Sequence, residues 1–316
     1  MKNIFKTIYI LSILFISCSK TDEVSSTILP TVNENKILFD AKVGSNSNLF
    51  TMNIDGTNEK QITNFTDGIN FVSAYQGSWS TDGTKIIFLS NKDKDGGSKI
   101  YTINSDGTNL VRLNNNARGE DSPKFSPDGT KIIFDANVGN NSHLFIMNID
   151  GTNEKQITNF TDGTNYVSTY EGSWSPDGTK IIFLSDKDKD GGSKIYIINS
   201  DGTNVVRINH NTRHEGSPKF SPDGKKILFD AKVGSNSHLF TMNIDGANEK
   251  QITNFTDGIN FVSTYEGSWS PDGTKIIFLS DKDKDGGSKI YIINSDGTNW
   301  VRINHNARGE DSPSWK

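Results

Sequence analysis

The sequence predicts an all-β protein, a six-bladed β-propeller closed by pairing of its C-terminal strand with its N-terminal blade. Three observations support this fold class. A repeat runs through the chain, each repeat unit contains four short strand candidates, and the last residues supply a strand that the first unit lacks. Repeats of this length with four strands per unit are typical of propellers.

The repeat has a period of 95 residues. The segment Ile-Ile/Leu-Phe-Asp begins at Ile37, Ile132 and Ile227. A diverged copy, Ile-Ile-Phe-Leu, lies inside each period and begins at Ile86, Ile181 and Ile276. Each period therefore holds one longer and one shorter unit, and the chain holds three such pairs.

One unit illustrates the expected strands, at 172–175, 181–184, 194–199 and 205–209. The first two are joined by Ser-Pro-Asp-Gly at 175–178, where proline in second place and glycine in fourth place suit a type I turn. The β-branched and aromatic run that follows this turn is typical of a strand. No long helical periodicity interrupts the pattern.

The two ends of the chain complement each other. Residues 312–315 (Ser-Pro-Ser-Trp) repeat the pattern of residues 122–125 (Ser-Pro-Lys-Phe), the first strand of a unit. The N-terminal unit lacks this segment and starts with its second strand at 36–39. We therefore expect the C-terminal strand to complete the N-terminal blade in a propeller domain of residues 31–316, because closure removes exposed sheet edges.

Residues 1–17 differ in kind from the repeat. Lys2 and Lys6 precede an apolar run at 8–16, which is the pattern of a secretory signal peptide. The segment before Cys18, the only cysteine in the chain, resembles the lipobox of bacterial lipoproteins, in which this cysteine carries the lipid. The alternative is an ordinary cleavage site with a cysteine nearby. Residues 18–30 form a polar tether.

The lipoprotein resemblance implies a protein held at the bacterial outer membrane by its lipid alone, because no internal apolar run is long enough to span a bilayer. Residues 19–23 (Ser-Lys-Thr-Asp-Glu) resemble the short signal that sends some lipoproteins to the cell surface, so the periplasmic and the surface face both stay open. A net charge of −5 without a basic cluster argues against nucleic-acid binding. We expect a monomer.

The repeat also carries a family resemblance. Residues 174–183 (Trp-Ser-Pro-Asp-Gly-Thr-Lys-Ile-Ile-Phe) and 195–204 (Ile-Tyr-Ile-Ile-Asn-Ser-Asp-Gly-Thr-Asn) resemble the TolB-type, WD40-like propeller repeat. Such repeats occur in protein-binding platforms, in the propellers of prolyl-peptidase-like enzymes and in polysaccharide-processing systems, so the resemblance implies a fold more than a function. TolB proteins carry an α/β domain before the propeller, whereas a short tether follows Cys18, which argues against a Tol–Pal role.

The loop between the second and third strands of the shorter units is rich in aspartate, as in Asp-Lys-Asp-Lys-Asp-Gly-Gly at 186–192. Alternating carboxylates before a glycine open a calcium-binding loop, so Ca²⁺ is the one cofactor that the sequence suggests. The alternative is a charged, solvated loop, since Lys194 and Ile197 stand at later ligand positions. The candidate ligands are Asp93 and Asp95, then Asp186, Asp188 and Asp190, and finally Asp281, Asp283 and Asp285.

The connection into each shorter unit is a candidate for ligand contact, because binding residues favour loops on a rigid frame. Each copy ends in a tyrosine and a polar neighbour, which offer a stacking face and an anchor for a sugar. The alternative is that these tyrosines pack between blades, as we expect for Trp79, Trp174 and Trp269. The candidates are Tyr75, Tyr170 with Glu171, and Tyr265 with Glu266.

The connections into the longer units carry a repeated arginine and glutamate. A three-fold set of Arg–Glu pairs would ring the mouth of the channel, and the alternative is a set of solvated loop charges. The pairs are Arg118 with Glu120, Arg213 with Glu215, and Arg308 with Glu310.

The sequence holds no Gly-x-Ser-x-Gly elbow, no phosphate loop and no His-Glu-x-x-His. The near-identity of the three periods favours equivalent binding sites. The sequence therefore favours a non-enzymatic platform that binds an envelope protein or a polysaccharide. The alternative is a hydrolase or lyase acting on polysaccharide, which requires acid and base residues in one repeat only. A purely structural ring is a third possibility.

Overall fold

The computed structural model describes residues 36–65, 72–93, 96–114, 116–161, 167–188, 192–255, 262–283 and 287–316. These residues lie in one compact unit, Glu34–Lys316. The expected leader, Cys18 and the tether fall outside the described residues. No helix in the described ranges has the length and apolar character needed to cross a bilayer.

The described chain forms six four-stranded antiparallel sheets. Blade 1 contains β24 (Glu310–Trp315), β1 (Lys36–Val43), β2 (Asn46–Asn53) and β3 (Lys60–Gln61). Blade 2 contains β4 (Ala74–Trp79), β5 (Lys85–Ser90), β6 (Lys99–Asn104) and β7 (Val111–Arg112). Blade 3 contains β8 (Glu120–Phe125), β9 (Lys131–Val138), β10 (Asn141–Asn148) and β11 (Lys155–Gln156).

The second half of the ring repeats this order. Blade 4 contains β12 (Thr169–Trp174), β13 (Lys180–Ser185), β14 (Lys194–Asn199) and β15 (Val206–Arg207). Blade 5 contains β16 (Glu215–Phe220), β17 (Lys226–Val233), β18 (Asn236–Asn243) and β19 (Lys250–Gln251). Blade 6 contains β20 (Thr264–Trp269), β21 (Lys275–Ser280), β22 (Lys289–Asn294) and β23 (Val301–Arg302).

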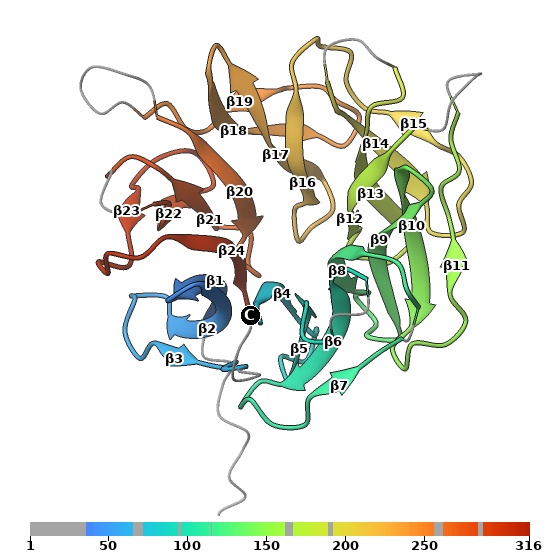
Figure 1. The fold of residues 1–316 in the computed structure, drawn as a ribbon. Helices are drawn as coiled ribbons and strands as arrows, with labels where there is room; N and C mark the ends of the chain where they lie inside the picture. Colours follow the sequence, from blue (N-terminus) through green and yellow to red (C-terminus); the bar gives the residue numbers. More distant parts are fainter. Residues whose placement is uncertain are drawn as a thin grey trace, which may run out of the picture. The chain divides into compact units, whose positions relative to one another are not determined.

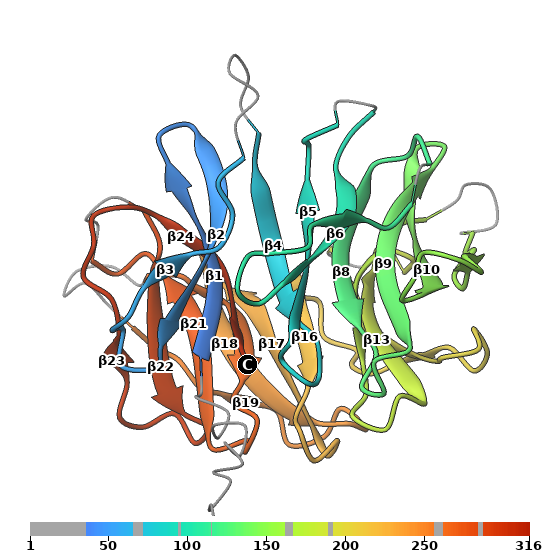
Figure 2. The same ribbon diagram turned by 90° about the horizontal axis from the view of Figure 1, so that it is seen from below.

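Each blade presents its first strand to the centre of the ring and its last strand to the rim (Figure 1). Seen from the side, the strands run between two faces of the ring (Figure 2). The tight Ser-x-Asp-Gly turns lie on one face, called here the turn face. The connections between blades and between the two middle strands lie on the other, called here the loop face.

The C-terminal strand closes the ring as the sequence predicts. In β24, Trp315 pairs with Ile37 and Ser314 pairs with Leu38. Figure 1 shows β24 beside the N-terminal strands β1 to β3. The fold class is therefore confirmed, including its mode of closure.

The hydrophobic core lies between neighbouring blades rather than within one sheet. At the junction of blades 2 and 3, Ile87 and Leu89 pack with Phe134 and Phe145. The two phenylalanine rings stack with centroids 5.6 Å apart. Such pairs of apolar faces hold each sheet against the next, which makes the centre of the ring a rigid frame. Trp269 is buried in the layer between blades 5 and 6, and Trp79 and Trp174 pack against the layers between blades 1 and 2 and between blades 3 and 4, as expected.

Candidate functional site

Every inner strand carries a bulge at the same place. In β12 the pairing with β13 shifts register between Tyr170 and Ser173. The residue at the bulge, Glu171, has a φ of 56°, and its counterparts Gln76 and Glu266 have φ values of 52° and 54°. A bulge re-aims a side chain. Here it directs three polar side chains toward the axis of the ring.

These bulge residues form a hydrogen-bonded belt. The Glu171 N–H donates to Oδ2 of Asp135 in the preceding blade over 2.7 Å. Oε2 of Glu171 accepts from the Ser217 N–H of the following blade over 2.8 Å. The same two bonds join Asp40, Gln76 and Ser122, and they join Asp230, Glu266 and Ser312. The belt therefore consists of three such groups, which together include residues of all six blades, and the third group ends at Ser312 in β24.

The belt surrounds a central channel of about 300 Å³. Lys124 and Lys219 line it together with Glu171 and Glu266. The Lys124 ammonium donates to the carbonyl of Gly172 over 3.1 Å. Two positions break the three-fold pattern, since Gln76 stands in place of a third glutamate and Ser314 in place of a third lysine.

Burial shifts the proton affinities around the channel. Burial, reinforced by the Asp311 carboxylate, raises the pKa of Asp40 to about 7 and that of Glu266 to about 8. Burial, with Glu171 nearby, raises the pKa of Asp230 to about 6. Burial next to Lys124 lowers the pKa of Lys219 to about 8. Near neutral pH the channel therefore holds carboxyl and ammonium groups that change charge readily.

A second cavity, the loop-face groove, brings together three of the predicted site residues. Tyr170, Glu171 and Asp186 line it with Asp121 and Asp135, at the junction of blades 3 and 4, and its volume is about 500 Å³. Three of its lining residues, Gln76, Ser122 and Glu171, also line the channel. The groove therefore leads from the loop face to the belt.

The candidate tyrosines lie on the inner strands rather than in the connections before them, because strands β4, β12 and β20 begin before the bulge. The Tyr170 hydroxyl bonds to Ser193, and its ring packs against the core of blades 4 and 5. Burial raises the pKa of this phenol. Tyr75 and Tyr265 lie in the same way, against Ser98 and Ser288. Contact with a ligand stays a prediction for all three.

The expected Arg–Glu pairs are wrong in their partners. Arg118 forms an ion pair with Glu154 and lies over the ring of Phe145, 4.4 Å from its centroid. Glu120 is buried, and its Oε2 accepts from the Ile100 N–H over 3.0 Å. Arg213 with Glu249 and Arg308 with Glu59 repeat the first arrangement. None of the three arginines lines the described channel. The arginines join one blade to the next, because each pairs with a glutamate that stands just before the outer strand of the following blade, and contact of the three arginines with a ligand stays a prediction.

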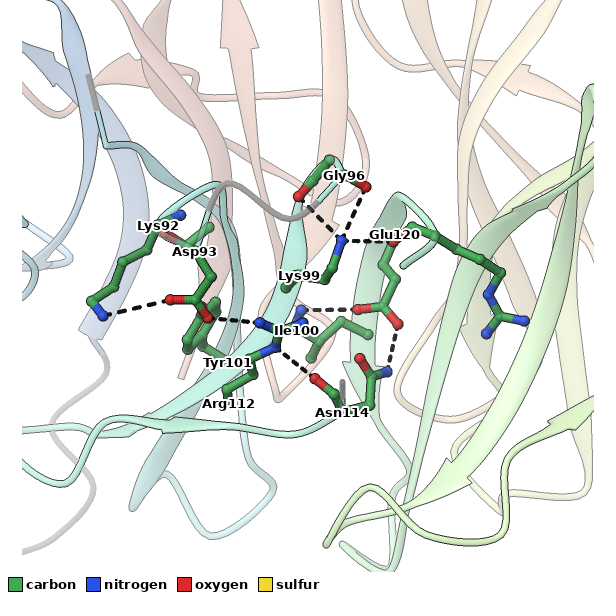
Figure 3. Close-up of polar contacts among 12 residues, drawn as sticks. Lys92, Asp93, Gly96, Lys99, Ile100, Tyr101, Arg112, Asn114 and Glu120 are labelled. Carbon is green, nitrogen blue, oxygen red and sulfur yellow. Dashed lines mark hydrogen bonds and ion pairs between the residues drawn. The ribbon is translucent and has the colours of Figure 1, made fainter. Parts of the chain in front are cut away.

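The Asp-rich loops hold their middle aspartate in a network of the protein's own donors (Figure 3). Asp93 accepts from the Tyr101 hydroxyl, and its Oδ2 lies 2.9 Å from Arg112. Asp188 and Asp283 are held in the same way by Arg207 and Arg302. Asp95, Asp190 and Asp285 lie outside the described residues. In the described part of the chain no three potential ligands converge, so calcium binding stays a prediction.

A buried lysine beside this network was missed by the sequence analysis. The Lys99 ammonium donates to the carbonyls of Gly96, Gly97 and Arg118 over 3.0, 3.3 and 2.9 Å (Figure 3). Lys99 is 1% exposed, and its counterparts Lys194 and Lys289 are fully buried. A repeated lysine at the first position of a strand was the only signal in the sequence. Each of these lysines joins the Asp-rich loop to the next blade.

The fold and its channel define a class, the six-bladed propellers with a polar axial channel. The chain belongs to the TolB beta propeller domain family, whose profile matches residues 113–257 and 208–316, together more than half of the chain. The family resemblance of the repeat is therefore confirmed.

Individual relatives agree with this assignment. The chain is 29% identical over 283 residues to the Tol-Pal system protein TolB of Francisella tularensis subsp. mediasiatica, covering 87% of this chain and 60% of that protein. Among solved structures it resembles TolB from Acinetobacter baumannii, with a TM-score of 0.73 and 21% identity over 89% of this chain and 66% of that one. It also resembles oligogalacturonate lyase from Vibrio parahaemolyticus, with a TM-score of 0.55 and 18% identity. That match covers 85% of this chain and 72% of the lyase chain. At these identities the structures show the fold alone.

Proposed function

We propose that this chain is a non-enzymatic platform, anchored by lipid at Cys18 to the outer membrane, that binds a partner protein of the cell envelope through its loop-face groove. The TolB-like relatives support an envelope-associated, protein-binding propeller. Since the chain spans only 60% of the length of those relatives, their activities and partners are transferred as part of the proposal.

The composition of the groove carries this proposal. Its lining contains five carboxyl groups and no lysine or arginine among the described residues. Asp121 and Asp186 are exposed there, whereas Asp135 is buried at the belt. A groove of this kind favours a segment that brings hydrogen-bond donors or positive charge, because complementary charge guides association and fixes register.

The groove also offers a rigid frame for such a segment. Its floor is the bulge of β12, which the belt holds on both sides through Asp135 and Ser217. A preorganised site loses little conformational freedom on binding. Polysaccharide processing, the second function class, would need a site that differs from its three-fold counterparts in acid and base residues. The groove residues Glu171 and Asp186 recur as Glu266 and Asp281 in the third period and are replaced by Gln76 and Asn91 in the first, so these acidic residues are not confined to one repeat.

The test is cross-linking of the tagged chain in its own envelope, followed by affinity purification and mass spectrometry. We expect a protein partner with the wild type, and a several-fold lower yield with the double variant Asp121→Asn, Asp186→Asn. The matched control Asp150→Asn, Asp245→Asn removes two exposed carboxylates outside the groove and should keep the yield. Recovery of polysaccharide alone, or equal yields from both double variants, would contradict the proposal.

The anchor has its own test. Metabolic labelling with a radioactive fatty acid should label the wild-type chain and leave Cys18→Ala unlabelled. A Cys18→Ala chain that still carries the label would overturn the lipoprotein assignment without affecting the groove.

A further inference from the structure

The loop-face groove lies at one of three junctions that the 95-residue repeat makes equivalent. Its counterparts lie between blades 1 and 2 and between blades 5 and 6. The groove residue Asp121, for example, corresponds to Gly216 and Asp311. Because the backbone repeats, the side chains that differ among the three junctions decide which of them accepts a positively charged group.

Asn137 distinguishes the groove from both counterparts. It lines the groove, and its Nδ2 lies 3.8 Å from an ideal Cβ on the neighbouring lining residue Gly119. The same position holds the exposed lysines Lys42 in β1 and Lys232 in β17. A cationic segment meets a like charge at those two junctions and a neutral amide at the groove.

The other junctions also differ in their remaining lining residues. Between blades 5 and 6, His214 takes the place of the glycine beside the lysine. Lys232 is close to it, since the Lys232 N–H donates to the His214 carbonyl over 3.1 Å, and burial together with Lys232 lowers the pKa of the imidazole. Between blades 1 and 2, Gln76 and Asn91 replace two of the groove's carboxyl groups. No acidic residue is confined to the groove, but its set of carboxyl groups without a lysine is.

A buried carboxyl oxygen at the groove lacks a donor. Asp135 is 2% exposed and is one of the lining residues. Its Oδ2 accepts from the Glu171 N–H, whereas its Oδ1 has no hydrogen-bond partner among the residues that the structure describes. Asp121 pairs with Asp135 across β8 and β9, and burial, reinforced by Asp121, raises the pKa of Asp135 well above its usual range. Since buried polar groups normally have partners, a cationic donor here would satisfy Oδ1 and favour the ionised carboxylate.

A guanidinium group suits this arrangement better than an ammonium. It carries five N–H donors in a planar fork and can bond two carboxyl groups at once, whereas an ammonium is a compact point charge. The exposed carboxyl groups of Asp121 and Asp186 belong to blades 3 and 4, the two walls of the groove. A fork that bonds both joins the two walls, and Asp135 offers it a further acceptor.

We propose that the loop-face groove is the one arginine-binding site among the three junctions, in which a guanidinium group of the partner's segment bonds Asp121, Asp135 and Asp186. This inference rests on the proposed function. It adds the side chain that the partner inserts and a stoichiometry of one segment per ring.

The test uses the full chain labelled with ¹⁵N and a short acetylated Gly-Arg-Gly amide as the probe. The backbone N–H signals of Asp121, Asn137 and Asp186 should shift saturably, and those of the counterparts Lys232 and Asp281 should stay. A peptide with citrulline in place of arginine has nearly the same shape without the charge, and it should bind about tenfold more weakly because the charge-assisted hydrogen bonds are lost. Equal shifts at both junctions, or equal affinities for the arginine peptide and either its citrulline or its lysine analogue, would overturn the inference.

Charge variants on one hairpin separate the site from the overall charge of the ring. Asn137→Lys gives the groove the lysine of its counterparts and should weaken binding of the arginine peptide several-fold. The matched control Asn140→Lys adds the same charge at the exposed turn of that hairpin, outside the groove lining, and should keep the affinity. Equal affinities of these two variants would contradict the account.

The reverse change tests for a gain. Lys232→Asn combined with His214→Gly copies two groove residues into the junction of blades 5 and 6 and should add a response at Asp281, which a damaged fold would not produce. Absence of this gain would contradict the role given to these positions. The peptide assay needs no envelope partner. Saturable peptide binding without a protein partner in the envelope would therefore contradict the proposed function alone, and a partner recovered while the peptide fails to bind would contradict this inference alone.

Discussion

The Ser312 N–H donates to Oε2 of Glu266 over 3.0 Å, and this bond joins the C-terminal strand β24 to blade 6. It is the last link of the belt that runs through Asp40, Gln76 and their counterparts. The closing strand is thus held on one side by pairing with β1 and on the other by a channel carboxyl group. Closure and channel chemistry share the same residues.

Replacement of Glu266 separates its charge from its hydrogen bond. Glu266→Gln keeps an acceptor for Ser312, as Gln76 does for Ser122 in the first period. We expect little change in the free energy of unfolding at pH 4 and a gain at pH 9, because the glutamate ionises above about pH 4.5 in the unfolded chain but only above about pH 8 in the folded ring. Glu266→Ala should be less stable than Glu266→Gln by about 0.5–1.5 kcal/mol, because the half-buried Ser312 N–H keeps only its second acceptor, Oδ1 of Asp311. Urea unfolding at both pH values checks this, and equal stability of the two variants would contradict it.

The buried aspartates predict how stability depends on pH. The pKa values of Asp40 and Asp230 rise from 3.8 to about 7 and about 6 on folding. Between about pH 4 and pH 7 the folded ring therefore binds more protons than the unfolded chain, and the free energy of unfolding falls as pH rises, by about 7 kcal/mol in total for these two groups. Thermal unfolding across this window checks the slope.

The matched variant is the double substitution Asp40→Asn, Asp230→Asn, which keeps acceptors for the belt but cannot titrate. Its stability should fall much less steeply than that of the wild type over the same window, with the remaining slope coming from Glu266 and Glu310, whose pKa values burial raises to about 8 and about 7. A wild-type chain that gains stability from pH 4 to pH 7 would contradict the burial of these carboxyl groups. Below about pH 4 the ionised turn aspartates, such as Asp82 and Asp177, reverse the trend, because their lowered pKa values favour the folded state only while they are charged.

Replacing the buried Lys99 should lower the free energy of unfolding. Lys99→Met keeps the apolar stem but leaves the carbonyls of Gly96, Gly97 and Arg118 without their shared donor. We expect a loss of about 1–3 kcal/mol in the free energy of unfolding, because buried acceptors are left unsatisfied. The control Lys85→Met removes an ammonium that reaches Asn104 from a less buried position, 3.2 Å away, and should cost under about 1 kcal/mol. Similar losses in the free energy of unfolding for Lys99→Met and Lys85→Met would contradict a stabilising role for the buried ammonium of Lys99.

Removing a tryptophan that packs between blades should lower the free energy of unfolding. Trp174 packs against the core between blades 3 and 4, so Trp174→Ala should lose about 3–5 kcal/mol. Trp300, which is 44% exposed, is the natural comparison, and Trp300→Ala should lose much less. Chemical denaturation of both variants measures the difference. A loss well under about 1 kcal/mol for Trp174→Ala would be incompatible with inter-blade packing.

The fold was predictable because its signals are local and repeated. Ser-Pro-Asp-Gly at 175–178 marks a turn and recurs at 126–129, 221–224 and 270–273, and the apolar run that marks the next strand recurs in all six units. Residues 312–315 match the missing first strand, which was enough to predict closure. These turn and strand patterns involve residues that are close in sequence, and each pattern occurs several times along the chain.

The belt and the contacts of Lys99 with the carbonyls of Gly96, Gly97 and Arg118 join residues that are neighbours in space but not in sequence. They could therefore not be predicted from the sequence. Glu171 was assigned to a connection because its bulge has no glycine or proline at the residue with positive φ. Asp135 follows the apolar run at 132–134 and lies inside β9, and nothing in the local sequence marks this carboxyl group as buried. The partners of Lys99 are backbone carbonyls, which every sequence contains. The partner of Arg118 was also hidden, because Glu154 is distant from it in the sequence whereas Glu120 is near.

The most direct test of the proposed function is photo-cross-linking from single positions of the chain in its own envelope. A benzophenone amino acid at Asp186 places the reactive group in the loop-face groove, and the same residue at Asp150 places it on an exposed turn outside every groove. The account predicts a discrete protein adduct from position 186 that is absent from position 150. An envelope in which position 186 yields no protein adduct, or the same adducts as position 150, would contradict the binding of a partner protein at this groove.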